Sequence, residues 1–327
     1  MARVVVTGGG GFVGSHLVER LVTEGNDVTV FDHAVPPEHL AGAAAARYVV
    51  GDIRDRSQLS QAITRDVDIV YHLAAVVGVD RYLDQPLDVI DINLSGTRNV
   101  LDLAEQAGAK TVVASTSEVF GKNPAVPWAE DDDRVLGSTA IDRWSYSSSK
   151  ALAEHLTFAF IRQRGLRATI VRYFNVYGPR QRPAFVISRT VHRVLRDLPP
   201  VLYDDGGQTR CFTYVDDAIT ATVTAGSSEK SDGECFNIGS SDETTMEEAV
   251  HLAIELAGAE PEIVPVDTAE RLGRRYQDLQ RRIPDTTKAY QVLGWRSTTG
   301  LREGIARTIE WARANPWWLA LDDSGQE

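Results

Sequence analysis

Short apolar runs alternate along this chain with longer segments whose apolar residues recur at helical spacing. Six β-branched runs in the first 175 residues predict strands buried on both faces, at 3–7, 27–32, 47–52, 68–75, 111–115 and 168–174. Helical periodicity lies between them, at 11–25, 57–65, 93–108 and 145–165, and Gly25, Gly108 and Gly165 stand where C-terminal caps belong. This alternation predicts right-handed crossovers and an α/β fold with a doubly wound parallel sheet.

The pattern changes after residue 175. Stretches rich in Pro, Gly, Arg and Tyr predict a smaller lobe of loops and short helices over the carboxyl edge of the sheet. We therefore expect the sheet domain to span 1–174, with a later contribution from about 211–240, and a mainly substrate-binding lobe to span 175–327. A length of 327 residues fits one such two-lobed unit.

Composition narrows the range of partners. The formal net charge of −12 argues against non-specific nucleic-acid binding, which needs a basic surface, but allows an anionic small molecule in a local basic pocket. No apolar run approaches the roughly 18 residues of a membrane span, and MARVVVTGGGG predicts neither a secretory signal nor a transit peptide. Cys211 and Cys235 are too few for a disulfide framework, and no Cys/His cluster predicts a metal. We expect a cytoplasmic protein without a metal.

The first chemical motif, VVVTGGGGFVGSHL, joins the first strand to the first helix. Gly8, Gly11 and Gly14 predict a dinucleotide site in this context, because missing side chains let backbone N–H groups and the helix N-terminus approach a pyrophosphate. Asp32 closes the second strand, where a carboxylate accepts both ribose hydroxyls and favours NAD over NADP. The alternatives are a simple turn for the glycines and a helix cap for Asp32. Asp52, after the third strand, either binds the adenine amino group or caps the next helix.

The second motif, SYSSSKALAEHL, places Tyr146 and Lys150 four residues apart, on one face of a helix. An ammonium group about 4 Å from a phenol is worth roughly 4 kcal/mol at an effective dielectric near 20, or about three pKa units. The pair therefore predicts a Tyr146 phenol whose pKa is lowered toward neutrality and which acts as a general base. Such a pair also occurs by chance, so its weight comes from the glycine motif and from the Ser/Thr residues after the fifth strand.

Six motifs in this order resemble the extended short-chain dehydrogenase/reductases that act on nucleotide sugars: TGGGGFVG, HLAA, ASTSEVFG, YSSSK, RYFNVYGP and GQTRCFTYVDD. The resemblance runs from Arg3 to about Trp311. It implies a Rossmann domain, NAD as cofactor, a UDP-sugar substrate and chemistry that begins by oxidising carbon 4 of the sugar. It also implies a homodimer, for which the apolar faces of 87–107 and 145–164 are available unless they are buried on the sheet.

The resemblance also implies roles for individual residues. Thr116, Tyr146 and Lys150 correspond to the catalytic Ser/Thr, Tyr and Lys. Asn175 and Arg210 resemble residues that touch the diphosphate of the substrate; the alternatives are a turn residue and a solvated surface charge. Besides the glycines, the two aspartates, Tyr146 and Lys150, the implied cofactor contacts are Phe12, Val13, Ile53, Leu73, Ala74, Ala75 and Ser115.

Glu118 separates the reactions that start from a 4-keto sugar. A 4-epimerase gives this carboxylate no evident task, and a dTDP-glucose dehydratase carries Asp and Glu where this chain has Ser117 and Glu118. The set Thr116, Ser117 and Glu118 resembles UDP-glucuronate decarboxylases, which form a UDP-4-keto-pentose or UDP-xylose. We expect Glu118 to be a negative group without a compensating cation, which favours expulsion of a desolvated carboxylate, or to manage proton delivery at carbon 5. Its alternative is a hydrogen bond to a backbone amide only.

One feature keeps other reactions open. The segment NVYGPRQRPAFVIS is short and resembles some epimerases, so a 4-epimerase acting on UDP-glucuronate or UDP-glucose is the alternative, followed by a 4,6- or 5,6-dehydratase and a non-catalytic dinucleotide sensor. The remaining expected substrate contacts are Arg182 at the sugar carboxylate, Tyr82 and Ser117 in the sugar pocket, and Arg282 at the nucleotide phosphates. Surface charge is the alternative for Arg182, and plain packing for Tyr82.

Overall fold

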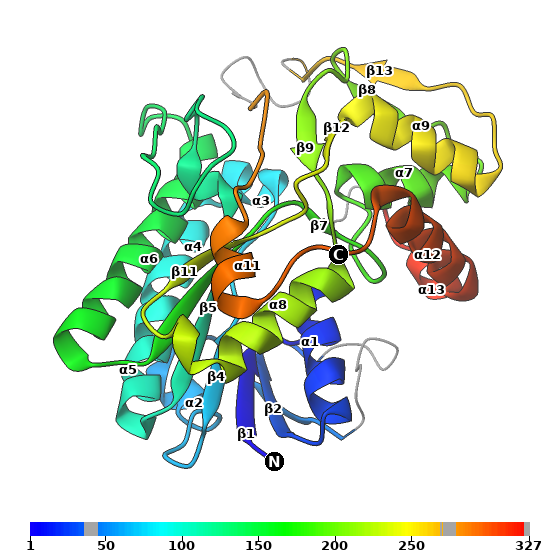
Figure 1. The fold of residues 1–327 in the computed structure, drawn as a ribbon. Coiled ribbons are helices and arrows are strands. Elements are labelled where there is room, and N and C mark those ends of the chain that lie inside the picture. The colour runs from blue at the N-terminus through cyan, green and yellow to red at the C-terminus, as the bar shows by residue number, and fades with distance from the viewer. Residues whose placement is uncertain (36–44, 269, 271–278, 324–327) are drawn as a thin grey trace.

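A parallel seven-stranded sheet lies at the centre of the structure (Figure 1), a computed structural model that describes residues 1–35, 45–268, 270 and 279–323. The strand order is β11-β6-β5-β4-β1-β2-β3. The bounds are β1 (Arg3–Thr7), β2 (Asp27–Asp32), β3 (Arg47–Val50), β4 (Ile69–His72), β5 (Lys110–Thr116), β6 (Ala168–Tyr173) and β11 (Cys235–Ile238). Six of these strands were predicted, and the doubly wound α/β fold is confirmed.

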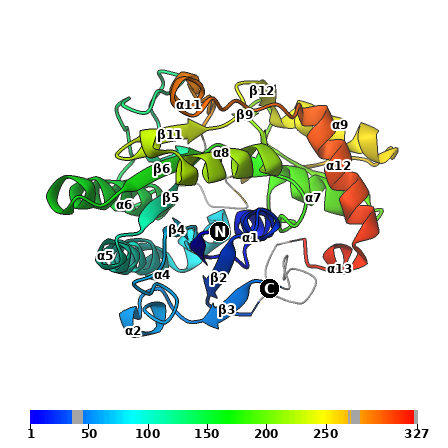
Figure 2. The same ribbon diagram turned by 60° about the horizontal axis from the view of Figure 1, so that its bottom comes forward.

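Helices cover both faces of the sheet (Figure 2). One face carries α1 (Phe12–Thr23) and α8 (Val215–Ser227), and the other carries α2 (Arg56–Leu59), α5 (Thr97–Ala107) and α6 (Arg143–Arg164). Gly108 and Gly165 end α5 and α6 in the left-handed region, both with φ 69°, as C-terminal caps should. No helix in the described ranges is long and apolar enough to cross a membrane.

The helix predicted over 57–65 is wrong, because α2 ends at Leu59. Asp55 caps its N-terminus by accepting hydrogen bonds from the backbone N–H groups of Ser57 and Gln58 at 2.8 and 3.2 Å. The apolar residues that suggested a longer helix, Ala62 and Ile63, are buried but belong to the turns that follow α2. Elsewhere, short elements lead into or follow the longer ones: α3 (Val79–Asp84), α4 (Pro86–Asp91), the π-helical turn η1 (Ile92–Gly96) and the 3-10 turns η2 (Ser117–Phe120) and η3 (Glu229–Ser231).

Apart from α8, β11 and α11, the chain after residue 175 builds a second lobe beyond the carboxyl ends of the strands (Figure 1). Its helices are α7 (Val186–Val194), α9 (Met246–Ala257), α12 (Leu301–Ala314) and α13 (Pro316–Leu319), whereas α11 (Thr287–Leu293) packs against β11 and α8. Its strands are β7 (Val176–Tyr177), β8 (Val201–Tyr203), β9 (Thr209–Cys211), β10 (Thr213–Tyr214), β12 (Glu243–Thr245) and β13 (Val264–Val266). Short helices were expected, but α9 and α12 run for 12 and 14 residues. A reciprocal capping box between Thr245 and Glu248 starts α9.

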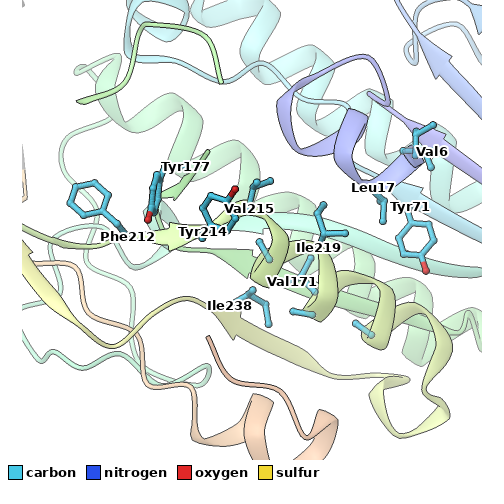
Figure 3. Packing of buried hydrophobic residues seen from close by; sticks show 14 of the residues in the cluster. Val6, Leu17, Tyr71, Val171, Tyr177, Phe212, Tyr214, Val215, Ile219 and Ile238 are labelled. Carbon is cyan, nitrogen blue, oxygen red and sulfur yellow. The ribbon is translucent and has the colours of Figure 1, made fainter. Parts of the chain in front are cut away.

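Apolar side chains form a separate core on each face of the sheet. The core under α1 and α8 continues into the second lobe (Figure 3), through Val6, Leu17, Tyr71, Val171, Ile219, Val215, Tyr214, Tyr177 and Phe212. The core under α5 and α6 contains Val5, Val70, Val113, Ile170, Val100, Leu101 and Phe160. One apolar core therefore runs through both and packs the sheet and the second lobe together.

A buried ion pair fixes α6 to the sheet. Arg172 of β6 donates from Nε and Nη2 to the two carboxylate oxygens of Glu154 of α6 at 2.9 and 2.7 Å, and Ser115 Oγ donates to the same carboxylate at 2.5 Å. Glu154 and Arg172 are only 2% and 5% exposed. A bidentate pair with a further hydrogen bond satisfies both charges in the interior.

We expect Arg172→Met to lower the free energy of unfolding by about 3–5 kcal/mol, because Glu154 is then left charged and buried. Urea denaturation measures this change, and Arg172→Met/Glu154→Leu should recover most of the loss. Arg164→Met is the matched control on α6: it removes an exposed pair with Asp102 and should cost less than about 1 kcal/mol. A loss no larger than that of the control would contradict the assignment.

Candidate active site

The glycine-rich turn between β1 and α1 is too tight for side chains at two of the predicted positions. A Cβ at Gly8, where φ is +73°, would lie 2.6 Å from the Ala74 nitrogen, and a Cβ at Gly14 would lie 2.1 Å from the Gly8 carbonyl oxygen. Gly11 begins α1 as its N-cap, with no side-chain cap and no acidic residue in the first turn, which contains Phe12 and Val13. The first N–H groups of α1 are therefore left for an anion, as a pyrophosphate site requires.

Asp32 lies beside this turn at the end of β2. Its Oδ2 accepts a hydrogen bond from the Gly10 nitrogen at 2.9 Å, and its Oδ1 accepts one from the His33 nitrogen at 2.7 Å. The carboxylate caps no helix in the described part of the chain, so the capping alternative is wrong there. The position beside the glycine turn agrees with the predicted ribose contact, which remains a prediction.

The other expected cofactor residues follow β3 and β4. Asp52 binds the guanidinium of Arg54, with Nη2 at 2.6 Å, and the cap of α2 is Asp55, so the capping role for Asp52 is wrong. Ile53 is buried, and a Cβ on Gly96 would lie 2.2 Å from its Cδ1.

The residues after β4 lie beside the glycine turn. Leu73 and Ala74 donate to the backbone and the hydroxyl of Thr7 at 3.0 and 3.3 Å, and Ala75 follows them. These residues, Asp32, Asp52 and the glycines thus stand at the carboxyl ends of four neighbouring strands, β4, β1, β2 and β3. A dinucleotide fits at this edge of a parallel sheet.

Three successive residues at the end of β5 are tied to α6. Lys150 Nζ donates to the Ala114 carbonyl at 2.6 Å, Ser115 Oγ donates to Glu154, and the Thr116 side chain is hydrogen-bonded to the Tyr146 phenol. The three helix residues are spaced by four, so they occupy one face of α6. Thr116, Tyr146 and Lys150 are thus brought together as predicted, while the Ser115 hydroxyl faces Glu154.

The expected lowering of the Tyr146 pKa by Lys150 is wrong for this structure. Burial raises the pKa of Tyr146, and the Glu118 carboxylate raises it further, against smaller opposing effects of Thr116, Arg143 and Arg282. Burial also lowers the pKa of Lys150 to about 8, with Glu154 opposing. The expectation from helical spacing counted the attraction between the two groups but not the loss of water around each of them.

Glu118 lies between two arginines, so the expectation of a carboxylate without a compensating cation is wrong. Arg143 Nη1 is 2.7 Å from Glu118 Oε2, and Arg282 pairs with Oε1. Burial raises the pKa of Glu118, but Arg282 and then Arg143 outweigh this effect and hold the pKa at about 2. The alternative of a backbone hydrogen bond only is also wrong. Arg282 was expected at the nucleotide phosphates, and the structure places its guanidinium on Glu118 instead.

The remaining substrate residues lie on the side of the second lobe. Arg210 of β9 is buried, and its Nη1 donates to the carbonyls of Thr209 and Leu279 at 2.7 and 2.8 Å, so the solvated-charge alternative is wrong. Asn175 has φ 40° and donates to the Cys211 carbonyl at 3.3 Å. Both diphosphate contacts stay predictions.

Arg182, Ser117 and Tyr82 are the remaining residues expected at the sugar. Arg182 Nη2 lies 3.4 Å from the Val77 carbonyl, close to the start of α3, and Ser117 is buried. The side chain of Tyr82, on α3, lies outside the described part of the chain.

Two charged residues of the site were not predicted. Arg143 precedes Tyr146 by three positions and contacts Glu118, and Glu154 follows Lys150 by four and contacts Ser115. Helical spacing from the YSSSK motif placed both residues on the face of α6 that carries Tyr146 and Lys150, and this signal was available in the sequence. What the sequence did not contain is the distance from that face to the ends of β5 and β6.

The chain is similar along its length to decarboxylases of nucleotide sugars. It is 39% identical to UDP-N-acetyl-alpha-D-glucosaminuronate decarboxylase of Bacillus cytotoxicus, over 95% of this chain and 98% of that protein. It is 32% identical to UDP-glucuronic acid decarboxylase 1 of Xenopus tropicalis, over 95% of this chain and 72% of that protein.

Solved structures with the same fold bind related ligands. MoeE5 in complex with UDP-glucuronic acid and NAD matches with a TM-score of 0.83 and 34% identity, over 96% of this chain and 99% of that one. UDP-glucose 4-epimerase of Thermotoga maritima with UDP-glucose matches with a TM-score of 0.88 and 31% identity, over 96% and 99%. The predicted resemblance is confirmed: the chain belongs to the NAD-dependent epimerase/dehydratase family, whose model matches residues 4–239.

Proposed function

We propose that this protein is an NAD-dependent decarboxylase of a UDP-linked uronic acid, with UDP-glucuronate as the substrate. The observation that carries the proposal is Glu118, two residues after Thr116 and beside Tyr146, held between Arg143 and Arg282. The named activities of the relatives from Bacillus cytotoxicus and Xenopus tropicalis support it. The Bacillus relative makes the 2-acetamido form of the same sugar acid a second candidate substrate.

The division of the chain suits this chemistry. We place the cofactor on residues 1–174 together with about 211–240, because both α8 and β11 of the later segment belong to the layers of the sheet. The glycine turn, Asp32 and Asp52 would hold NAD, which supplies a hydride acceptor when bound. The lobe over 175–327 would hold the nucleotide, with Arg210 and Asn175 at the diphosphate.

In the first step, Tyr146 takes the proton from the carbon 4 hydroxyl of the sugar. Thr116 shares a hydrogen bond with the phenol and so orients its oxygen toward one point in the site. The phenol is buried and its pKa is raised, so the site needs positive charge nearby to stabilise the anion. Arg143 and Arg282 both lower the pKa of Tyr146 and so stabilise this anion. Lys150 donates a hydrogen bond to the Ala114 carbonyl and so holds the end of β5 that carries Thr116.

The resulting sugar is a ketone at carbon 4 with its carboxylate at the beta position. When carbon dioxide leaves, the bonding electrons pass to carbon 5 and the carbonyl oxygen, where the Tyr146 hydroxyl donates a hydrogen bond to the enolate while Thr116 donates its own to the phenol oxygen. A proton must then return to carbon 5. The proton that Tyr146 took from the carbon 4 hydroxyl is available for this transfer. Glu118 is ionised and already paired, so we assign it the orientation of the transfer rather than the storage of the proton.

A UDP-hexose or UDP-uronate 4-epimerase is the second candidate function. The similarity to the Thermotoga maritima epimerase and the short segment after Asn175 favour it. An epimerase would use the same Thr116, Tyr146 and Lys150 but would leave the sugar carboxylate in place.

We further propose a homodimer formed through α4 and α6. The inner faces of α5 and α6 are buried on the sheet, but Leu87 and Ile90 of α4 and Leu152 of α6 are 77%, 40% and 48% exposed. The two helices pack against each other, so these side chains offer apolar area on adjacent elements. A second copy of the chain would cover this area.

We also propose a cytoplasmic location. Cys211 and Cys235 are both free and buried, as suits a reducing compartment. Fractionation of the source cells tests this location, and recovery of the protein from an oxidising compartment would contradict it.

Incubation with UDP-glucuronate and NAD is expected to give a nucleotide sugar that has lost carbon dioxide, as measured by mass spectrometry. The 2-acetamido substrate should be tested in parallel, because it separates the two candidate substrates.

Tyr146→Phe should abolish turnover and leave NAD affinity unchanged, while Glu118→Gln should oxidise carbon 4 and accumulate reduced NAD. Unchanged mass with inversion at carbon 4 would identify an epimerase, and equal carbon dioxide release by Glu118→Gln and wild type would exclude the assigned role of Glu118.

Glu118 should also make stability depend on pH in acid. Its pKa is about 2 in the folded chain against an ordinary value of 4.5, so its stabilisation is complete above about pH 4.5 and is lost as the pH falls through about 2. Between about pH 6 and about pH 3.5, the wild type should lose more free energy of unfolding than Glu118→Gln, by on the order of 1 kcal/mol. Urea denaturation at both values measures the difference, and equal losses would show that Glu118 is not paired in solution.

Leu152→Glu is expected to convert the dimer into a monomer in sedimentation equilibrium, because it places a charge in the proposed interface. Val264→Glu is the matched control, since Val264 is an exposed apolar residue of β13 in the other lobe. A wild-type chain that sediments as a monomer would overturn the interface.

A further inference from the structure

Arg143 is the most deeply buried cation of the site. It is 0% exposed, it stands in the first turn of α6, and its guanidinium lies over the ring of Trp144 at 5.2 Å from the centroid. Trp144 is itself buried, in an apolar cluster with Val119 and Phe120 of η2. The packing around this guanidinium therefore leaves it little freedom to move, and its contact with the Trp144 ring adds a cation–π interaction that holds it in place.

The two guanidinium groups on Glu118 come from different parts of the chain. Arg143 shares α6 with Tyr146 and takes Oε2, while Arg282 arrives from the second lobe, after α9 and β13, and takes Oε1. Glu118 itself stands on η2, directly after β5. The Arg143 contact thus ties the carboxylate to the helix of the catalytic tyrosine, and the Arg282 contact ties it to the lobe that closes over the sheet edge.

We propose that Arg143 is a positioning residue that fixes the Glu118 carboxylate relative to the Tyr146 phenol for the steps after carbon 4 oxidation. The inference rests on the proposed decarboxylase function. With Oε2 held from α6, the carboxylate keeps one orientation and directs Oε1 toward the second lobe. Arg143 acts through Glu118 and does not itself touch the reacting atoms.

This role differs from a purely structural one in its effect on the separate steps of the reaction. A residue that only stabilises the fold would affect NAD binding, carbon 4 oxidation and decarboxylation together. A residue that positions Glu118 slows the later steps more than it slows oxidation by Tyr146, to whose anion Arg143 also contributes positive charge, since misplacement of a catalytic group by about 1 Å costs up to roughly 100-fold in rate.

A double-mutant cycle in Arg143 and Glu118 tests the proposal. Arg143→Met should lower the rate of carbon dioxide release roughly 10- to 100-fold, with NAD affinity changed less than about threefold, and reduced NAD should accumulate. In a Glu118→Gln background the same substitution should cost less than about threefold, because the partner is already lost. Arg143→Lys should recover part of the rate. Arg164→Met, on the exposed end of α6, is the control and should match wild type.

Two outcomes would overturn the proposal: an equal rate loss in both backgrounds, or a loss of NAD affinity as large as the loss of rate. A stability measurement keeps the test independent of the reaction. Arg143→Met should lower the midpoint of urea denaturation, because the buried Glu118 carboxylate loses one of its two cations. Adding Glu118→Gln should restore part of that loss, because it removes the buried charge. If the wild type turns over no UDP-uronate but the midpoint is restored, the pairing stands and the proposed function fails; if the midpoint is not restored, the pairing itself is wrong.

Discussion

The hydrogen bonds between the end of β5 and one face of α6 are the constraint on which the site depends. They join each of three consecutive strand residues to a different helix residue, and the buried pair of Glu154 and Arg172 locks the helix against β6 as well. Because the bonds involve successive residues, a slip of α6 by one turn would break all of them together. The Tyr146 phenol and the Thr116 hydroxyl are therefore placed by the same contacts that hold the sheet and helix layers together.

Burial shifts the pKa values of the ionisable groups in this site, and neighbouring charges oppose those shifts. Desolvation alone would leave Tyr146, Glu118 and Lys150 all closer to their neutral forms. For Glu118 two guanidinium groups reverse this tendency and keep a carboxylate where burial would protonate it. For Tyr146 the opposing groups are weaker than burial and Glu118 together, so the pKa of the phenol is raised. The second lobe contributes to this balance through Arg282, which pairs with Glu118 and opposes the rise in the Tyr146 pKa.

The sequence predicted the fold well where local chemistry decides structure. Strand runs, helix caps at Gly108 and Gly165, and the glycine turn were all readable, because each depends on neighbours along the chain. The helix predicted over 57–65 extended too far beyond α2, because Ala62 and Ile63 are buried in turns and periodicity does not distinguish such turns from a helix. In the site, the residues of the motifs were found, but the contacts of Glu118 with Arg143 and Arg282 were not predicted. Those partners are distant in sequence, and no spacing rule predicts that Arg282 reaches η2.

The edge strand β11 has a consequence for how the protein folds during synthesis. The chain leaves β6 at Tyr173 and supplies the next strand, β11, only at Cys235, after α7 and α8 have been passed. While a ribosome synthesises the intervening stretch, β6 has an unpaired edge, and such an edge is a template for association with other nascent chains. The sheet is therefore completed during biosynthesis only after much of the second lobe has been synthesised. The order of translation thus makes folding of the sheet depend on the second lobe.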